Sequence, residues 1–91
     1  MNEEKQMFKE KIRQLRDAVS TREELSEYAD FLAEGYQKGF FEEQPVSEYV
    51  GGVAGVVHGL EGFYKNQSLE MPEKPTWNMM ARILTAAFFH S

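Results

Sequence analysis

The chain of 91 residues has room for one small domain, and its 15 acidic and 10 basic side chains give a formal net charge of −5. It contains no cysteine, which excludes a disulfide framework, a thiolate metal site and a cysteine nucleophile. We therefore expect residues 1–91 to form a single domain that is stabilised by packing alone.

The acidic charge is concentrated in the middle of the sequence. Residues 20–48 carry eight acidic and two basic side chains, whereas residues 1–19 carry four acidic and five basic ones. Direct binding to nucleic acid needs clustered lysine and arginine, so this balance argues against it. The N-terminus lacks the apolar run of a secretory signal, and the long apolar stretch at residues 50–60 is too short to span a bilayer. These features favour a cytoplasmic protein with basic protein partners and no membrane contact.

The first two predicted elements are amphipathic helices. Residues 3–19 carry apolar side chains at spacings of four, three and four, which form a narrow stripe on one helix face: Phe8, Ile12, Leu15 and Val19. A second helix is predicted to start after Ser20 and Thr21, which supply N-cap hydroxyls, with Glu23 and Glu24 as capping-box partners. Gly39 is placed to end this helix in a left-handed conformation. Its predicted core face consists of Leu25, Tyr28, Ala29, Leu32, Ala33 and Tyr36.

Two more helices are predicted after a connection at residues 40–44. Pro45 begins the third, which runs to about Lys65 and turns one side toward the core: Val46, Tyr49, Val50, Val53, Val57, Leu60 and Tyr64. After a loop at residues 66–74, a fourth helix runs from Pro75 to about His90. Its apolar residues, with Met79, are expected in the core: Trp77, Met80, Ile83, Leu84, Ala87 and Phe88. The sequence thus predicts an all-α fold, a compact bundle of about four helices.

The third predicted helix also has a second face, made of glycine. Gly51, Gly55 and Gly62 share it with His58, and Gly52 and Gly59 lie beside it. Each glycine costs about 0.5 to 1 kcal/mol relative to alanine inside a helix, so something must offset the loss. Packing of another helix of the same chain is the first interpretation, contact with a partner or a second copy is the second, and a broken helix is the third. On the last helix, Phe89 falls on the polar side and is either covered by the first helix or part of a homodimer contact.

The second helix carries a row of carboxylates at spacings of four, three and four, with Phe31 at its border: Glu23, Glu27, Asp30 and Glu34. An exposed aromatic ring beside carboxylates is typical of a binding hot spot, while a solvated helix face is the alternative. Carboxylates on a convex helix do not converge on a cleft as acid–base catalysis requires. No phosphate loop or metal-ligand spacing is present either, so we predict no catalytic, cofactor or metal site.

The C-terminal third resembles a family of small acidic bacterial proteins known only as a domain of unknown function. The resemblance lies in residues 62–66, in the Pro-x-Trp pattern ending at Trp77, and in the alanine, isoleucine and leucine pattern of residues 81–87. Members end the last helix with an aromatic residue and an acid. Phe89 matches the aromatic residue, whereas His90 stands in place of the acid. The resemblance implies no activity, so no residue inherits a catalytic role.

The leading hypothesis is a protein-binding module without enzymatic activity, which engages a basic partner through the carboxylate row and Phe31. It is similar to immunity or inhibitor proteins in general character. The alternative is a structural homodimer with a glycine-lined interface, formed by Gly51, Gly55, His58, Gly62 and Phe89.

Overall fold

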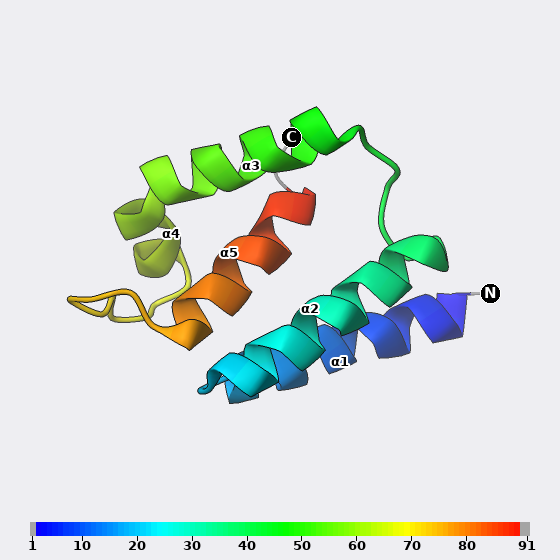
Figure 1. Ribbon diagram of the computed structural model, residues 1–91, viewed down its shortest axis with the longest axis horizontal. Coiled ribbons are helices and arrows are strands. Elements are labelled where there is room, and N and C mark those ends of the chain that lie inside the picture. Colours follow the sequence, from blue (N-terminus) through cyan, green and yellow to red (C-terminus); the bar gives the residue numbers. More distant parts are fainter. Residues whose placement is uncertain (1, 90–91) are drawn as a thin grey trace.

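The computed structural model describes residues 2–89, which form five helices and no strand. The helices are α1 (Asn2–Ala18), α2 (Arg22–Gln37), α3 (Val46–His58), α4 (Leu60–Asn66) and α5 (Trp77–Phe89) (Figure 1). The prediction of a small all-α bundle is confirmed. His90, the last residue of the predicted fourth helix, lies outside the described residues. None of the helices in residues 2–89 is long and apolar enough to cross a bilayer.

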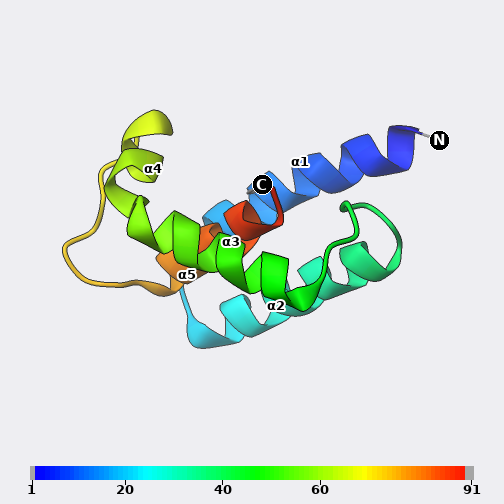
Figure 2. The ribbon, with the colours of Figure 1, turned by 90° about the horizontal axis from the view of Figure 1, so that it is seen from above.

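Helices α1 and α2 lie side by side and run in opposite directions (Figures 1 and 2). Three residues of the predicted α1 stripe, Phe8, Ile12 and Val19, are buried, whereas Leu15 is 37% exposed. Between the helices, the Phe8 ring lies on the backbone of Gly35, where a β-carbon would come closer than 3.0 Å to three ring atoms. The part of the core between α1 and α2 therefore depends on close packing of an aromatic ring against a glycine.

The connection between α2 and α3 contributes to the core, which the sequence analysis did not anticipate. Gly39 has a φ of 82°, as predicted for a left-handed helix end, and the Phe40 amide donates to the Gly35 carbonyl. The chain then places Phe41 in the interior, where its ring stacks on Phe88 with centroids 4.1 Å apart. A buried aromatic residue thus anchors the connection to the end of α5.

The predicted third helix is two helices, because the chain bends at Gly59 between α3 and α4. The Gly59 amide still donates to the Gly55 carbonyl, but the φ and ψ angles of Gly59, −100° and 28°, are not helical. The bend allows α4 to bury Tyr64 against Met79 and Ile83 of α5. The interpretation of a broken helix is therefore correct, and the prediction of a continuous helix from Pro45 to Lys65 is wrong.

The core face of α3 also differs from the prediction. Val46, Val50 and Val57 are 78%, 57% and 50% exposed, whereas Gly52 and Val56 are buried. The rotation of the helix is fixed by Tyr49, whose hydroxyl donates to the Leu84 carbonyl at 2.8 Å and whose ring contacts Phe88. Helix α3 therefore faces α5 with a line of residues that includes Gly52 and Val56, whereas Val46, Val50 and Val57 lie at the surface.

Helix α5 is the central element of the fold. It contacts α1 and α2 on one side and α3 on the other (Figure 1). From Ala81 to Phe88 every residue is buried or half-buried, so this part of the helix has no solvent-facing side. Its start is less covered: Met79 is buried as predicted, but Trp77 and Met80 are 44% and 42% exposed. These two residues lie on the open side of the first helical turn, and their placement in the core was wrong.

Candidate functional site

The carboxylate row on α2 begins at a well-defined helix start. Thr21 Oγ1 accepts a hydrogen bond from the Glu24 amide, and Glu24 Oε1 accepts bonds from the Thr21 amide and from Ser20. This is the predicted capping box. Hydrogen bonds, first from the Ser20 backbone amide and then from its hydroxyl, hold the pKa of Glu24 below its ordinary value. Glu24 therefore belongs to the cap and stays out of the row.

The row itself is fully displayed to solvent. All four predicted carboxylates are exposed: Glu23, Glu27, Asp30 and Glu34. Glu23 pairs with Arg22 and Glu34 with Lys38, both at the surface, where such pairs contribute little. Glu27 and Asp30 form no ion pair within residues 2–89. The middle of the row thus holds two charges that are free to meet a cationic partner.

Phe31 is half-buried, which corrects the expectation of an exposed ring. It stacks on Phe8 with centroids 4.8 Å apart and lies 6.1 Å from the ring of Tyr28. The remaining exposed part of Phe31 lines a groove of about 780 Å³ between α1 and α2. The residue therefore belongs to the floor of a groove beside the carboxylate row and does not project from the helix.

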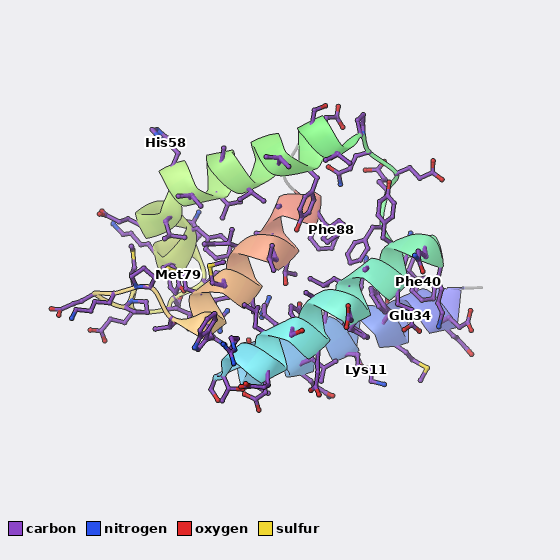
Figure 3. The ribbon with its side chains drawn as sticks, viewed as in Figure 1. Lys11, Glu34, Phe40, His58, Met79 and Phe88 are labelled. Carbon is purple, nitrogen blue, oxygen red and sulfur yellow. The ribbon has the colours of Figure 1, made fainter. Side chains whose placement is uncertain are left out.

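This α1–α2 groove combines an apolar floor with a charged rim. Phe8, Phe31 and Phe40 form much of the floor, and Met7, at 69% exposure, lies at the edge. Both signs of charge occur on the rim, with Glu34 and Lys11 on facing helices (Figure 3). The groove and the row share Glu34. A partner that contacts the carboxylates can therefore also place apolar side chains in the groove.

The residues predicted for a glycine-lined interface do not form one surface. Gly51 and Gly62 are open, since a β-carbon on either would meet nothing within 4 Å, and the interpretation that another helix of this chain covers them is wrong. His58 points away from the other helices (Figure 3), and Gly55 is half-buried. Phe89 is 59% exposed but lines a separate cleft that includes none of these residues.

That separate cleft is a feature that the sequence analysis missed. It has a volume of about 420 Å³ and lies between α1, the α3–α4 bend and α5. Four cationic side chains line it, together with Val56, Phe63 and Phe89; they are Lys9, Arg13, Arg16 and Arg82. We refer to it as the basic cleft. The spacings of four and three between Lys9, Arg13 and Arg16 signal a common helix face, as they do for the carboxylate row.

The described residues also limit the chemistry available. Within residues 2–89, no three histidine, aspartate or glutamate side chains gather closely enough to hold a metal ion. Burial raises the pKa values of Tyr28, Tyr49 and Tyr64, so these hydroxyls stay protonated at neutral pH. Tyr28 and Tyr49 use their hydroxyls in contacts between helices. These two hydroxyls therefore stabilise the packing of α2 and α3 against α5.

Comparison with known proteins identifies the family but supplies no activity. No curated protein and no solved structure matches the chain. A family model described as a family of unknown function, DUF7660, matches residues 21–90, which include α2 to α5 and leave α1 outside. Because the match covers most of the sequence, the chain belongs to the DUF7660 family.

Proposed function

We propose that the protein is a non-enzymatic binding module whose carboxylate row receives a basic surface of a partner protein, in the manner of an immunity or inhibitor protein. The observation that carries this proposal is the position of the row beside the α1–α2 groove. Glu27 and Asp30 supply charge that forms no ion pair within residues 2–89, and the groove supplies an apolar floor of aromatic rings. Binding hot spots combine such apolar anchors with complementary charge.

The test is a pair of charge-matched variants. Glu27→Lys with Asp30→Lys reverses the row, while Glu70→Lys with Glu73→Lys makes the same charge change in the exposed loop before α5. Tagged protein is used to capture partners from lysate of the source organism at low and high salt. We expect a stoichiometric partner that is captured at low salt by the wild type and the loop variant, released at high salt, and lost from the row variant.

The controls distinguish site-specific recognition from general charge attraction. Both variants must keep the helical circular dichroism and melting temperature of the wild type, since all four positions are exposed. Capture that survives in the row variant, or that disappears equally in the loop variant, would contradict the assignment of the row as the binding surface.

A second candidate function is self-association through α3. It is favoured by the exposed valines Val46, Val50 and Val57, which lie on an outer face with the open Gly51 and exposed His58. Acidic molecules repel one another, so an uncharged face is where two copies can meet most readily. This version of the homodimer does not include Phe89.

Sedimentation of the purified protein over a wide concentration range tests self-association. A dimer is expected for the wild type and a monomer for Val50→Lys, because the new charge would be buried in the interface. Leu69→Lys, at an exposed leucine outside α3, is the control and should remain dimeric. A wild-type monomer at every concentration would rule this candidate out.

A further inference from the structure

The basic cleft is a concentration of positive charge on a protein whose net charge is −5. Figure 2 shows α1 and α4 on the same side of the molecule, with the end of α5 between them. Helix α1 supplies Lys9, Arg13 and Arg16 to one wall, and Val56 and Phe63 come from the opposite one. Among the described residues that line the cleft, none is aspartate or glutamate. Its chemistry is therefore cationic on one side and apolar on the other.

Arg82 is held in place before any ligand arrives. Its side chain is only 11% exposed, its Nε–H donates to Asn78 Oδ1 at 2.9 Å, and its Nη2 donates to Asp17 Oδ1 at 3.1 Å. Asn78 is itself fixed, because its Nδ2 donates to the Arg16 and Val19 carbonyls. A guanidinium has five N–H donors, so three of those on Arg82 have no acceptor within residues 2–89.

Arg82 Nη1 donates to no acceptor within residues 2–89. No fully buried side-chain nitrogen or oxygen in the described residues lacks a hydrogen-bond partner, so Nη1 must reach solvent. Arg82 lines the cleft, which is where that solvent lies. A guanidinium anchored from behind with its outer edge free is pre-organised to bind a carboxylate, because little conformational entropy remains to be lost.

The acids nearby do not neutralise the cleft. Asp17 is shared by Arg16 and Arg82, since its Oδ1 atom accepts from both at 3.1 Å. Lys9 and Arg13 form no ion pair within residues 2–89. Within the described residues, one carboxylate thus pairs with two of the four cations, and the two without an ion pair, Lys9 and Arg13, both lie on α1.

The spacing of the charges selects the occupant. Lys9 and Arg16 are seven positions apart on α1, which corresponds to about 10 Å along the helix axis. A ligand with a single anionic headgroup cannot contact both ends, whereas carboxylates two residues apart on an extended peptide lie on the same face about 7 Å apart, where the long lysine and arginine side chains can reach both. The side chain between them can reach the apolar wall. We propose that the basic cleft binds an acidic peptide segment in extended conformation, with an aromatic or aliphatic residue held by Phe63 and Phe89.

This site is separate from the one under the proposed function, because it has the opposite charge and no residue in common with the carboxylate row. A basic partner on α2 and an acidic segment in the cleft could be bound at the same time. The variants that test the cleft leave α2 unchanged, so failure of one proposal is distinguishable from failure of the other.

The experiment measures fluorescence anisotropy of a short fluorescein-labelled peptide in which glutamate pairs flank a central phenylalanine. The full-length protein should bind this peptide in a salt-dependent manner, and should not bind a version with glutamine in place of glutamate. Arg13→Glu should weaken binding about tenfold or more, because it reverses a charge in the middle of the cationic wall. Phe89→Ser should weaken it severalfold at unchanged salt dependence, because only the apolar contact is lost.

Lys11→Glu is the matched control, since it makes the same charge change at an exposed position of α1 that lines the α1–α2 groove and not the cleft. It should leave peptide affinity within about twofold of the wild type. Equal weakening by Lys11→Glu and Arg13→Glu would overturn the proposal, as would absence of binding by the wild type. Tighter binding to a DNA oligonucleotide or to phosphatidylserine vesicles than to the peptide would also overturn it, and would assign the cleft to those anions.

Discussion

At the scale of single residues, a buried hydrogen-bond chain joins α2 to α5. Thr85 Oγ1 donates to the Ala81 carbonyl at 2.7 Å, so the Tyr28 hydroxyl, 2.6 Å from the same oxygen, must be the donor to Thr85. Burial raises the pKa of Tyr28, which keeps that proton in place. Both side chains are almost fully buried, and within residues 2–89 the Tyr28 hydroxyl depends on Thr85 for its partner, whereas Thr85 also has the Ala81 carbonyl.

This dependence predicts an asymmetry between two substitutions. Thr85→Val strands the Tyr28 hydroxyl in the interior and should lower the free energy of unfolding by about 1 to 3 kcal/mol. Tyr28→Phe removes the donor and leaves Thr85 with its bond to Ala81, so the expected cost is only about 0.5 to 1.5 kcal/mol. Urea unfolding of both variants and of the double variant provides the check. A double variant whose cost equals the sum of the two would show that the pair is not coupled.

The capping residue Glu24 predicts a pH dependence. Hydrogen bonds from Ser20 and Thr21 lower its pKa below 4.5 in the folded state, so the folded protein binds this proton less readily than the unfolded chain. The stabilisation is therefore complete above the unfolded pKa and is lost as the pH falls through the folded one. Glu24→Gln should melt at a lower temperature than the wild type at pH 7, and the difference should shrink below about pH 4.5. A difference that is constant from pH 7 to pH 3 would contradict this account.

At the scale of helices, two glycines in similar secondary structure should respond in opposite directions to alanine. At Gly35 the new methyl group would meet the Phe8 ring, and any shift of that ring would disturb its packing against Phe31, Phe40 and Phe41. Gly35→Ala should cost about 1 to 3 kcal/mol through overpacking. Gly51→Ala places its methyl group in open space and should gain about 0.5 to 1 kcal/mol through helix propensity. Chemical denaturation of the two variants side by side tests both signs, and a destabilised Gly51→Ala would mean that this face is covered in solution.

Helix α3 shows why the sequence could predict a helix and still misplace its face. Two apolar lines run along neighbouring faces of the helix, one through Val46, Val50 and Val57 and one through Val53 and Val56. Hydrophobicity alone favours the line with more branched side chains. The choice between them depends on α5, where the Leu84 carbonyl accepts from Tyr49 and Phe88 meets its ring. Such contacts come from residues some 35 positions away and leave no trace in helical periodicity.

Other features of the helices could be predicted from the sequence because they depend on interactions between neighbouring residues. The capping box of α2 and the left-handed Gly39 depend on neighbours within four residues, and both were predicted correctly. The bend at Gly59 and the burial of Phe41 depend on distant partners in α5. The same division applies to the candidate site. The exposure of the carboxylate row followed from spacing, but the aromatic floor beside Phe31 and the basic cleft required the assembled helices.

At the scale of the whole molecule, the arrangement around α5 explains why its polar residues contact other helices. Asn78 and Arg82 reach the end of α1, and Thr85 reaches α2, so all three make contacts between helices. A central helix covered on both sides needs polar side chains to pair with its neighbours, because buried polar groups are stable only when they are bonded. If α5 had one side exposed to solvent, as in a simpler bundle, these three polar side chains would lie in water.

The central position of α5 leads to a prediction about α1, which lies outside the residues matched by the family model. A fragment of residues 21–91 would lose Phe8, Ile12 and Val19, all buried in the native core. Burial of such side chains contributes about 1.5 to 3 kcal/mol each, so the loss of about 5 to 9 kcal/mol is comparable with the whole stability of a small domain. The fragment would also lose Asp17, which pairs with Arg82, and the carbonyl acceptors of Asn78. We expect it to show reduced helical circular dichroism and no cooperative thermal transition, whereas the full chain melts in one step. A cooperative transition in the fragment would instead show that α2 to α5 form a self-sufficient fold and that α1 is an addition to it.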